Sequence, residues 1–164
     1  YAEAGRSGQP SGGAVATRRR LILAARLLGR LLCGGALLIL TLGTIVTGSG
    51  PHSGDAKTTV RFEIEPRLVS WLHADVVLFF LGVLFALFVL LRLGQAPRPM
   101  QRRAVTLLAF SLAQGCLGYV QHFSGLPELL LSLHVLGSVL VWVGTLQLND
   151  ALQHGDPGTE IEVV

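Results

Sequence analysis

Four long apolar stretches, separated by short polar segments, dominate the pattern of this chain. They cover residues 31–46, 68–91, 104–120 and 129–148, and a start near residues 27–28 would lengthen the first. A helix that crosses the hydrocarbon core of a bilayer needs about 20 apolar residues. The pattern therefore predicts an all-α integral membrane protein, a four-transmembrane-helix bundle made of two similar hairpins.

Composition excludes the main alternative, a single soluble domain. The chain has 164 residues, of which 51% are hydrophobic and only 14% are charged, and its mean hydropathy is +0.58. A soluble domain of this composition would have too few polar residues to cover its surface. Two cysteines, Cys33 and Cys116, lie in different apolar stretches, and we interpret both as small core residues rather than a disulfide.

Arginines are distributed unevenly along the chain, and this distribution predicts its orientation. One group precedes the first span: Arg6, Arg18, Arg19, Arg20, Arg26 and Arg30. A second group fills the loop between the second and third spans: Arg92, Arg98, Arg102 and Arg103. Basic loops remain on the cytoplasmic side of membranes, so we expect both termini there. The formal net charge of +3 then reflects topology and does not indicate a nucleic-acid partner.

The same pattern divides the chain into three parts. Residues 1–26 are expected to form a flexible basic cytoplasmic leader or linker, because their first part is rich in Gly, Ser and Ala. Residues 27–149 form the predicted membrane domain, and residues 150–164 a cytoplasmic tail. The chain begins with Tyr1, and we expect it to be a piece of a longer protein.

Two histidines inside the apolar stretches are the main candidates for chemistry. His73 and His134 each follow a leucine and lie about six residues inside their spans, or roughly 9 Å at 1.5 Å per residue. Both spans are expected to run inward, so the two imidazoles should lie at one depth. Ionisable residues inside a membrane are costly and usually functional. Two such imidazoles could hold a flat iron cofactor, most naturally heme, from its two faces.

Other interpretations of these residues remain open. Each histidine could instead make only a hydrogen bond between helices. Zinc or non-heme iron would need further ligands, and Asp75 is expected to point about 200° away from His73 on a helix. Small residues share a face with His134, and others lie in the third span, which packing alone would also explain. These residues are Gly137, Ser138, Val141 and Thr145, and Ser111, Gly115, Gly118 and His122.

Three further histidines are expected to have no ligand role. His122 lies at the outer end of the third span, where an interfacial histidine needs no function. His52 lies in the turn-rich loop after the first span, and His154 lies in the tail. Both are expected to be solvated.

Five short motifs, taken in order, resemble bacterial heme A synthase. They are TGSGPHSGD at 47–55, LHAD at 72–75, QGCLGYVQ at 114–121, GLP at 125–127 and LH at 133–134. The likeness covers about residues 27–148. It corresponds to the C-terminal four-helix half of that eight-helix protein.

The resemblance implies a function and a set of partners. Heme A synthases oxidise a methyl group of heme O to the formyl group of heme A, and their C-terminal half carries heme B. By this resemblance His73 and His134 would be the axial ligands of heme B iron, in a bacterial cell membrane. The partner would be the missing N-terminal half or a second copy of the chain. Heme O would be the substrate of the full enzyme, and heme O synthase and a terminal oxidase are further candidate partners.

The chain also departs from the pattern of the catalytic half. In that half a glutamate lies three residues before the first histidine, and the corresponding position here is Ser70. The pair of loop cysteines of the N-terminal half is also missing. No catalytic residue is therefore assigned to this chain. Two alternatives remain beside the oxidoreductase interpretation: a membrane b-type cytochrome that carries electrons, and a heme-free membrane scaffold subunit.

Overall fold

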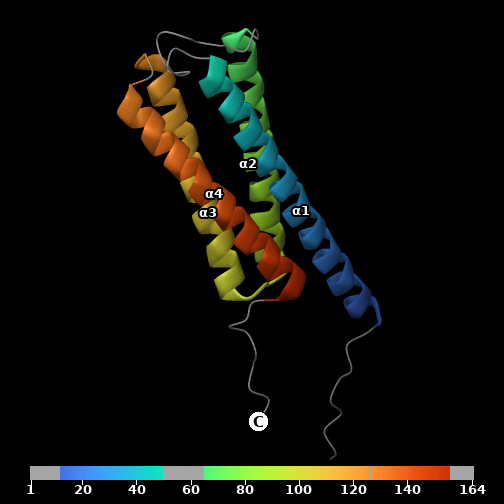
Figure 1. The fold of residues 1–164 in the computed structure, drawn as a ribbon. Helices are drawn as coiled ribbons and strands as arrows, with labels where there is room; N and C mark the ends of the chain where they lie inside the picture. Colours follow the sequence, from blue (N-terminus) through green and yellow to red (C-terminus); the bar gives the residue numbers. More distant parts are fainter. Residues whose placement is uncertain (1–11, 50–64, 126, 156–164) are drawn as a thin grey trace, which may run out of the picture.

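The protein forms a bundle of four long helices in the computed structural model, which describes residues 12–49, 65–125 and 127–155 (Figure 1). The helices are α1 (Gly12–Ser49), α2 (Pro66–Leu93), α3 (Arg98–Phe123) and α4 (Glu128–His154). All four are long and apolar enough to cross a membrane. The predicted all-α, four-helix membrane fold is confirmed.

Prolines and glycines mark where several of these helices begin and end. Pro66 opens α2, and Pro97 and Pro127 immediately precede α3 and α4. Proline suits the start of a helix because the first backbone N–H groups have no intrahelical acceptor. Gly155, with φ +87°, ends α4, in a backbone conformation that favours glycine.

Each helix extends beyond the apolar stretch that predicted it. The largest difference is in α1, whose 38 residues span about 57 Å at 1.5 Å per residue. Its first turns include part of the segment expected to be a flexible leader, so residues 12–26 are helical. Arg18, Arg19 and Arg20 in these turns are exposed, as expected for a helix that continues past the hydrocarbon core, whereas Arg26 is half-buried and donates to the carbonyls of Leu152 and Gln153.

The helices are arranged in a ring in the order of the chain. α1 packs against α2 and α4, and α3 packs against the same two helices. Among the described residues, no close backbone contact joins α1 to α3 or α2 to α4. α2 and α4, which carry the two candidate histidines, therefore lie diagonally across the bundle.

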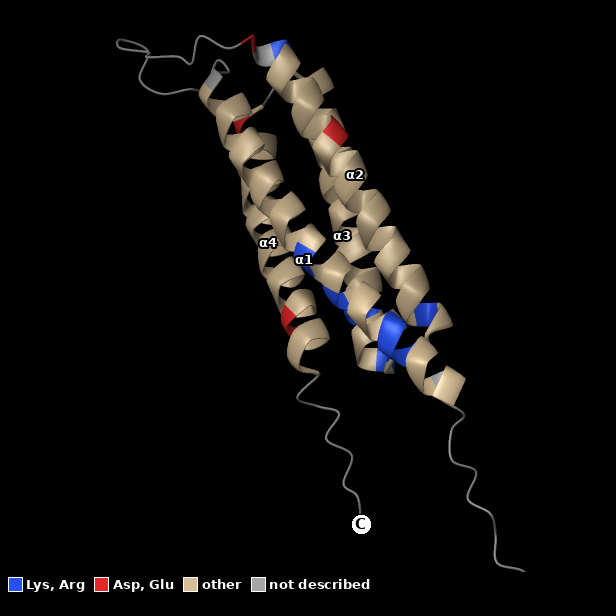
Figure 2. Ribbon diagram, turned by 90° about the vertical axis from the view of Figure 1, so that its right-hand side faces the viewer, with Lys and Arg blue, Asp and Glu red and all other residues tan. Residues whose placement is uncertain are grey.

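The packed core is concentrated at one end of the bundle. We call this the arginine end, because Arg18–Arg20 of α1, Arg92 at the end of α2 and Arg98–Arg103 of α3 lie there (Figure 2). The core includes Leu32, Leu84, Leu87 and Leu148, each no more than 1% exposed. Toward the opposite end, Leu42 and Val69 are the only buried large apolar residues among those described, and the two hairpins separate there (Figure 1).

Candidate functional site

His73 lies on α2, seven residues after Pro66, in the half of the bundle away from the arginine end. Its imidazole packs against α1 at Gly43: a Cβ at that glycine would lie 3.3 Å from His73 Cε1. The ring also lies beside the backbone carbonyl of Ile39, one turn earlier on α1. His73 Nδ1 is buried and has no partner in hydrogen-bond geometry among the described residues.

His134 has the equivalent environment in the other hairpin. It lies six residues after Glu128 on α4, and a Cβ at Gly118 of α3 would lie 3.2 Å from its Cε1. The ring lies beside the carbonyl of Gln114, again one turn before the glycine. His134 Nδ1 is also buried without a hydrogen-bond partner within the described part of the chain.

The two hairpins thus repeat one local arrangement. The first helix of each supplies a glycine and, four residues earlier, a carbonyl. The second helix supplies an imidazole that occupies the space above the glycine. The two imidazoles interact electrostatically with each other, although the backbones of their helices make no close contact. The structure therefore gives His73 and His134 equivalent positions in the two hairpins, close enough for their charges to interact.

Polar side chains of α3 add to this interior. The oxygen atoms Ser111 Oγ, Gln114 Oε1 and Gln121 Oε1 are buried and have no hydrogen-bond partner among the described residues. The side chain of Gln114 presses against Gly137 of α4, where a Cβ would clash with it. No role for the two glutamines is predicted from the sequence. Their spacing of seven residues, which places both on one face of an apolar helix, was the available signal.

The small-residue faces expected from the sequence are only partly interior. Gly137 and Thr145 of α4 and Ser111 of α3 are buried, and Gly118 contacts His134. Gly115 faces open space, with nothing within 4 Å of a Cβ placed there. Some of these residues therefore allow close helix packing, whereas Gly118 makes room for a ring.

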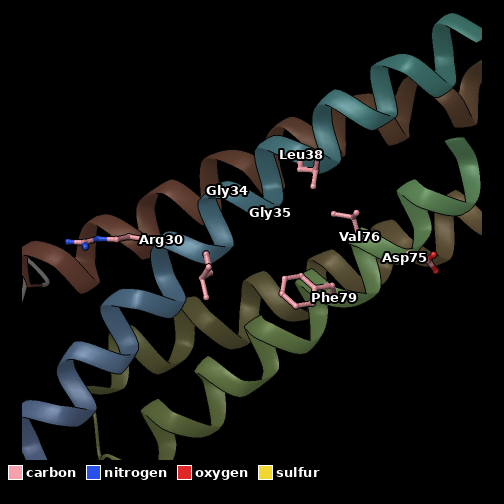
Figure 3. A pocket seen from close by; sticks show the side chains of 8 residues that line it. Arg30, Gly34, Gly35, Leu38, Asp75, Val76 and Phe79 are labelled. Carbon is pink, nitrogen blue, oxygen red and sulfur yellow. The ribbon is translucent and has the colours of Figure 1, made fainter.

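Asp75 does not join the histidines. It is exposed and lies at the edge of a groove of about 410 Å³ between α1 and α2, which is lined mainly by apolar side chains and by Gly34 and Gly35. Val76 and Phe79 point from α2 toward α1, whereas Asp75 points away from this space (Figure 3). The helical prediction that Asp75 and His73 face different directions is confirmed.

The remaining titratable and thiol candidates are peripheral. His122 is exposed and makes an edge contact with Phe123, with ring centroids 5.3 Å apart. His154 Nδ1 lies 2.9 Å from Asp150 Oδ1 on the exposed end of α4. Cys33 and Cys116 are free thiols on the diagonal helices α1 and α3; Cys33 is half-buried and Cys116 is exposed, so the interpretation of Cys116 as a core residue is wrong. His52 and most of its loop lie outside the described residues.

The histidine pair offers two possible metal ligands, and no third protein ligand lies beside it among the described residues. No group of three His, Cys, Asp or Glu side chains that could hold a metal ion occurs among the described residues. Zinc and non-heme iron sites normally use three or four protein ligands. Heme needs only axial ligands, because the macrocycle supplies the other four. Two half-buried imidazoles, each with a buried and unpartnered Nδ1 and each beside a glycine, fit that requirement.

Comparisons with known proteins assign neither a family nor a function to this chain. No protein-family model, no curated protein and no solved structure matches this chain.

Proposed function

We propose that this chain binds one heme B between α2 and α4, with His73 and His134 as axial ligands. The observation that supports this most is the paired arrangement of the two imidazoles. They come from diagonal helices and are close enough for their charges to interact, each above a glycine and each with a buried Nδ1 that lacks a hydrogen bond. Buried polar atoms without partners are uncommon in folded proteins, and ligation that turns each ring so that its Nδ1–H meets the neighbouring carbonyl would account for both.

The neighbouring backbone suits imidazoles that bind a metal. A metal-bound histidine usually donates its second ring N–H to a carbonyl or carboxylate, which fixes the orientation of the ring. The carbonyls of Ile39 and Gln114 lie beside His73 and His134 in matching positions. One ring nitrogen of each histidine would hold iron and the other would be oriented by its carbonyl. Gly43 and Gly118 would keep the space that each ring occupies.

The packing of the bundle leaves the histidine half suited to a large apolar ligand. Most of the buried apolar core lies toward the arginine end. In the half that contains the histidines, Leu42 and Val69 are the buried large apolar residues within the described part of the chain. A macrocycle in this half would supply the missing contact surface. Gln114 and Gln121 would then offer polar groups at its edge.

At the level of biological role, we propose the cofactor half of heme A synthase. The support is the ordered set of motifs, including LHAD at 72–75 and QGCLGYVQ at 114–121. When bound, the heme would supply reversible one-electron chemistry, with its potential set by the two imidazoles and by burial. The protein holds the ligands, excludes water and provides a surface for the catalytic half. Oxidation of the heme O methyl group would occur in that other half, so this chain alone is expected to be inactive.

An electron-carrying b-type cytochrome is the second candidate. Ser70 occupies the position at which the catalytic half of the enzyme carries glutamate, and this favours electron transfer without chemistry on a substrate. Co-expression with the N-terminal half of a heme A synthase separates the two. Heme A formed from heme O only when both halves are present supports the enzyme. If the protein binds heme but heme O is not converted to heme A with both halves present, the electron-carrier function is supported instead.

Heme quantification in single variants tests the ligand assignment. Wild-type protein in detergent is expected to hold one heme per chain, with a low-spin spectrum and a sharp alpha band on reduction. His73→Ala and His134→Ala each remove one of two strong bonds, so heme should be lost or become high-spin and bind carbon monoxide. His154→Ala, at an exposed position, is the control and should remain low-spin. A low-spin spectrum that persists in both ligand variants would contradict the assignment.

A further inference from the structure

A second pocket lies at the arginine end, where the turn between α2 and α3 meets the membrane-spanning part of both helices. It has a volume of about 350 Å³ and is lined by Phe88, Arg92, Arg98, Gln101, Arg102 and Val105. It is separate from the histidine pair, which lies in the other half of the bundle. The proposed heme function does not use any of these residues.

The polar side of this pocket is strongly basic. Three of its six lining residues are arginines and none is acidic. Arg92 Nη1 donates a hydrogen bond to Gln101 Oε1 (3.2 Å), and Gln101 Nε2 donates to the carbonyl of Ala96 (2.7 Å). These bonds fix the turn. Arg98 and Arg102 are exposed and make no hydrogen bond or ion pair with other described residues, so their guanidinium groups are available to an anion.

The start of α3 adds to the positive potential. α3 begins at Arg98, its N-cap residue Pro97 makes no side-chain hydrogen bond, and its first turn contains no acidic residue. Pro99 has no N–H, and the Gln101 N–H donates to the Pro97 carbonyl. The N–H groups of Arg98 and Met100 remain without an intrahelical acceptor, and the helix dipole favours an anion nearby.

The other side of the pocket is apolar. Phe88 lies five residues before the end of the candidate membrane span Arg67–Leu93, and Val105 lies seven residues after the start of the span Arg98–Phe123. Basic loops set topology in any membrane protein, but topology does not require arginines to share a pocket with an aromatic and an aliphatic side chain. An occupant with a negative headgroup and a hydrocarbon tail would satisfy both sides.

We propose that this pocket binds an anionic phospholipid of the leaflet on the arginine side. The phosphate would bind Arg98 and Arg102, with Arg92 as the third cation. The first acyl-chain carbons would lie against Phe88 and Val105. Basic pockets at the cytoplasmic ends of membrane helices are known to recognise such headgroups.

Lipid binding to the purified full chain tests the proposal. Native mass spectrometry in micelles containing equal amounts of phosphatidylglycerol and phosphatidylcholine should show selective retention of phosphatidylglycerol. Arg98→Gln combined with Arg102→Gln removes two unpartnered cations and should weaken this retention at least tenfold. The matched control is Arg19→Gln combined with Arg20→Gln, which removes the same charge from exposed positions on α1 and should retain wild-type selectivity.

Three results would overturn the proposal. One is equal loss of selectivity in the control pair, which would indicate general charge attraction. Another is unchanged selectivity in the Arg98/Arg102 variant. The third is competition by inorganic phosphate at the concentration that phosphatidylglycerol requires, because the apolar wall would then contribute nothing. Helix content measured by circular dichroism, which should equal that of the wild type, excludes misfolding as the cause of a loss.

Discussion

Gly118→Ala is the smallest change that tests whether the glycine beside His134 serves the proposed heme site. The added Cβ would lie 3.2 Å from His134 Cε1, closer than ordinary carbon–carbon contact of about 3.5–4.0 Å. The imidazole must therefore move by a few tenths of an ångström. A ring turned away from its preferred rotamer costs about 0.5–1.5 kcal/mol.

That cost should be paid only in the heme-bound state, where the ring cannot move freely. It corresponds to about a two- to tenfold increase in the heme dissociation constant. Gly115→Ala is the matched control, because it lies on the same helix and a Cβ there meets nothing within 4 Å. Both substitutions gain the same helix propensity, about 1 kcal/mol, so the difference between them isolates the contact with His134.

Titration of the heme-free protein with heme, followed by its absorption spectrum, measures this difference. We expect wild type and Gly115→Ala to bind heme with equal affinity and Gly118→Ala to bind it more weakly. Equal affinities for the two alanine variants would refute the reasoning, since the ring would not then need the space above Gly118. Gly43→Ala, with a corresponding distance of 3.3 Å to His73, should behave like Gly118→Ala.

Three further predictions concern orientation, His122 and the core. A reporter fused after Val164 should register as cytoplasmic and one inserted at Ser53 as extracytoplasmic, because of the arginine asymmetry; the reverse would invert the assignment. His122→Ala should keep wild-type heme content, since this side chain is exposed; heme loss equal to that of a ligand variant would show that it is needed. Leu84→Ala should lower the free energy of unfolding in mixed micelles by about 2 kcal/mol. This is the low end of the range for a buried leucine, because lipid also solvates the leucine side chain in the unfolded state. Leu78→Ala, where the side chain is 60% exposed, should change it little, and equal effects would contradict the assigned core.

Much of the candidate site could be predicted from the positions of polar residues in apolar segments. His73 and His134 each stand near the start of a span, and two hairpins of similar length place them at similar depth. Helical periodicity also separated Asp75 from His73. The sequence predicts no role for the two glutamines of α3 inside the bundle, because a single sequence does not say which face of a membrane helix is interior.

The sequence by itself determined the four spans, the pairing into hairpins and the asymmetry of arginines, since these depend on length, hydropathy and charge alone. Only the tertiary structure decided that α2 and α4 are diagonal, that Gly43 and Gly118 contact the two imidazoles, and that the core lies toward the arginine end. The physical reason is that lipid is as apolar as a leucine core. The lipid-facing and interior faces of a membrane helix therefore differ little in hydropathy, and close packing fixes the rotation of each helix.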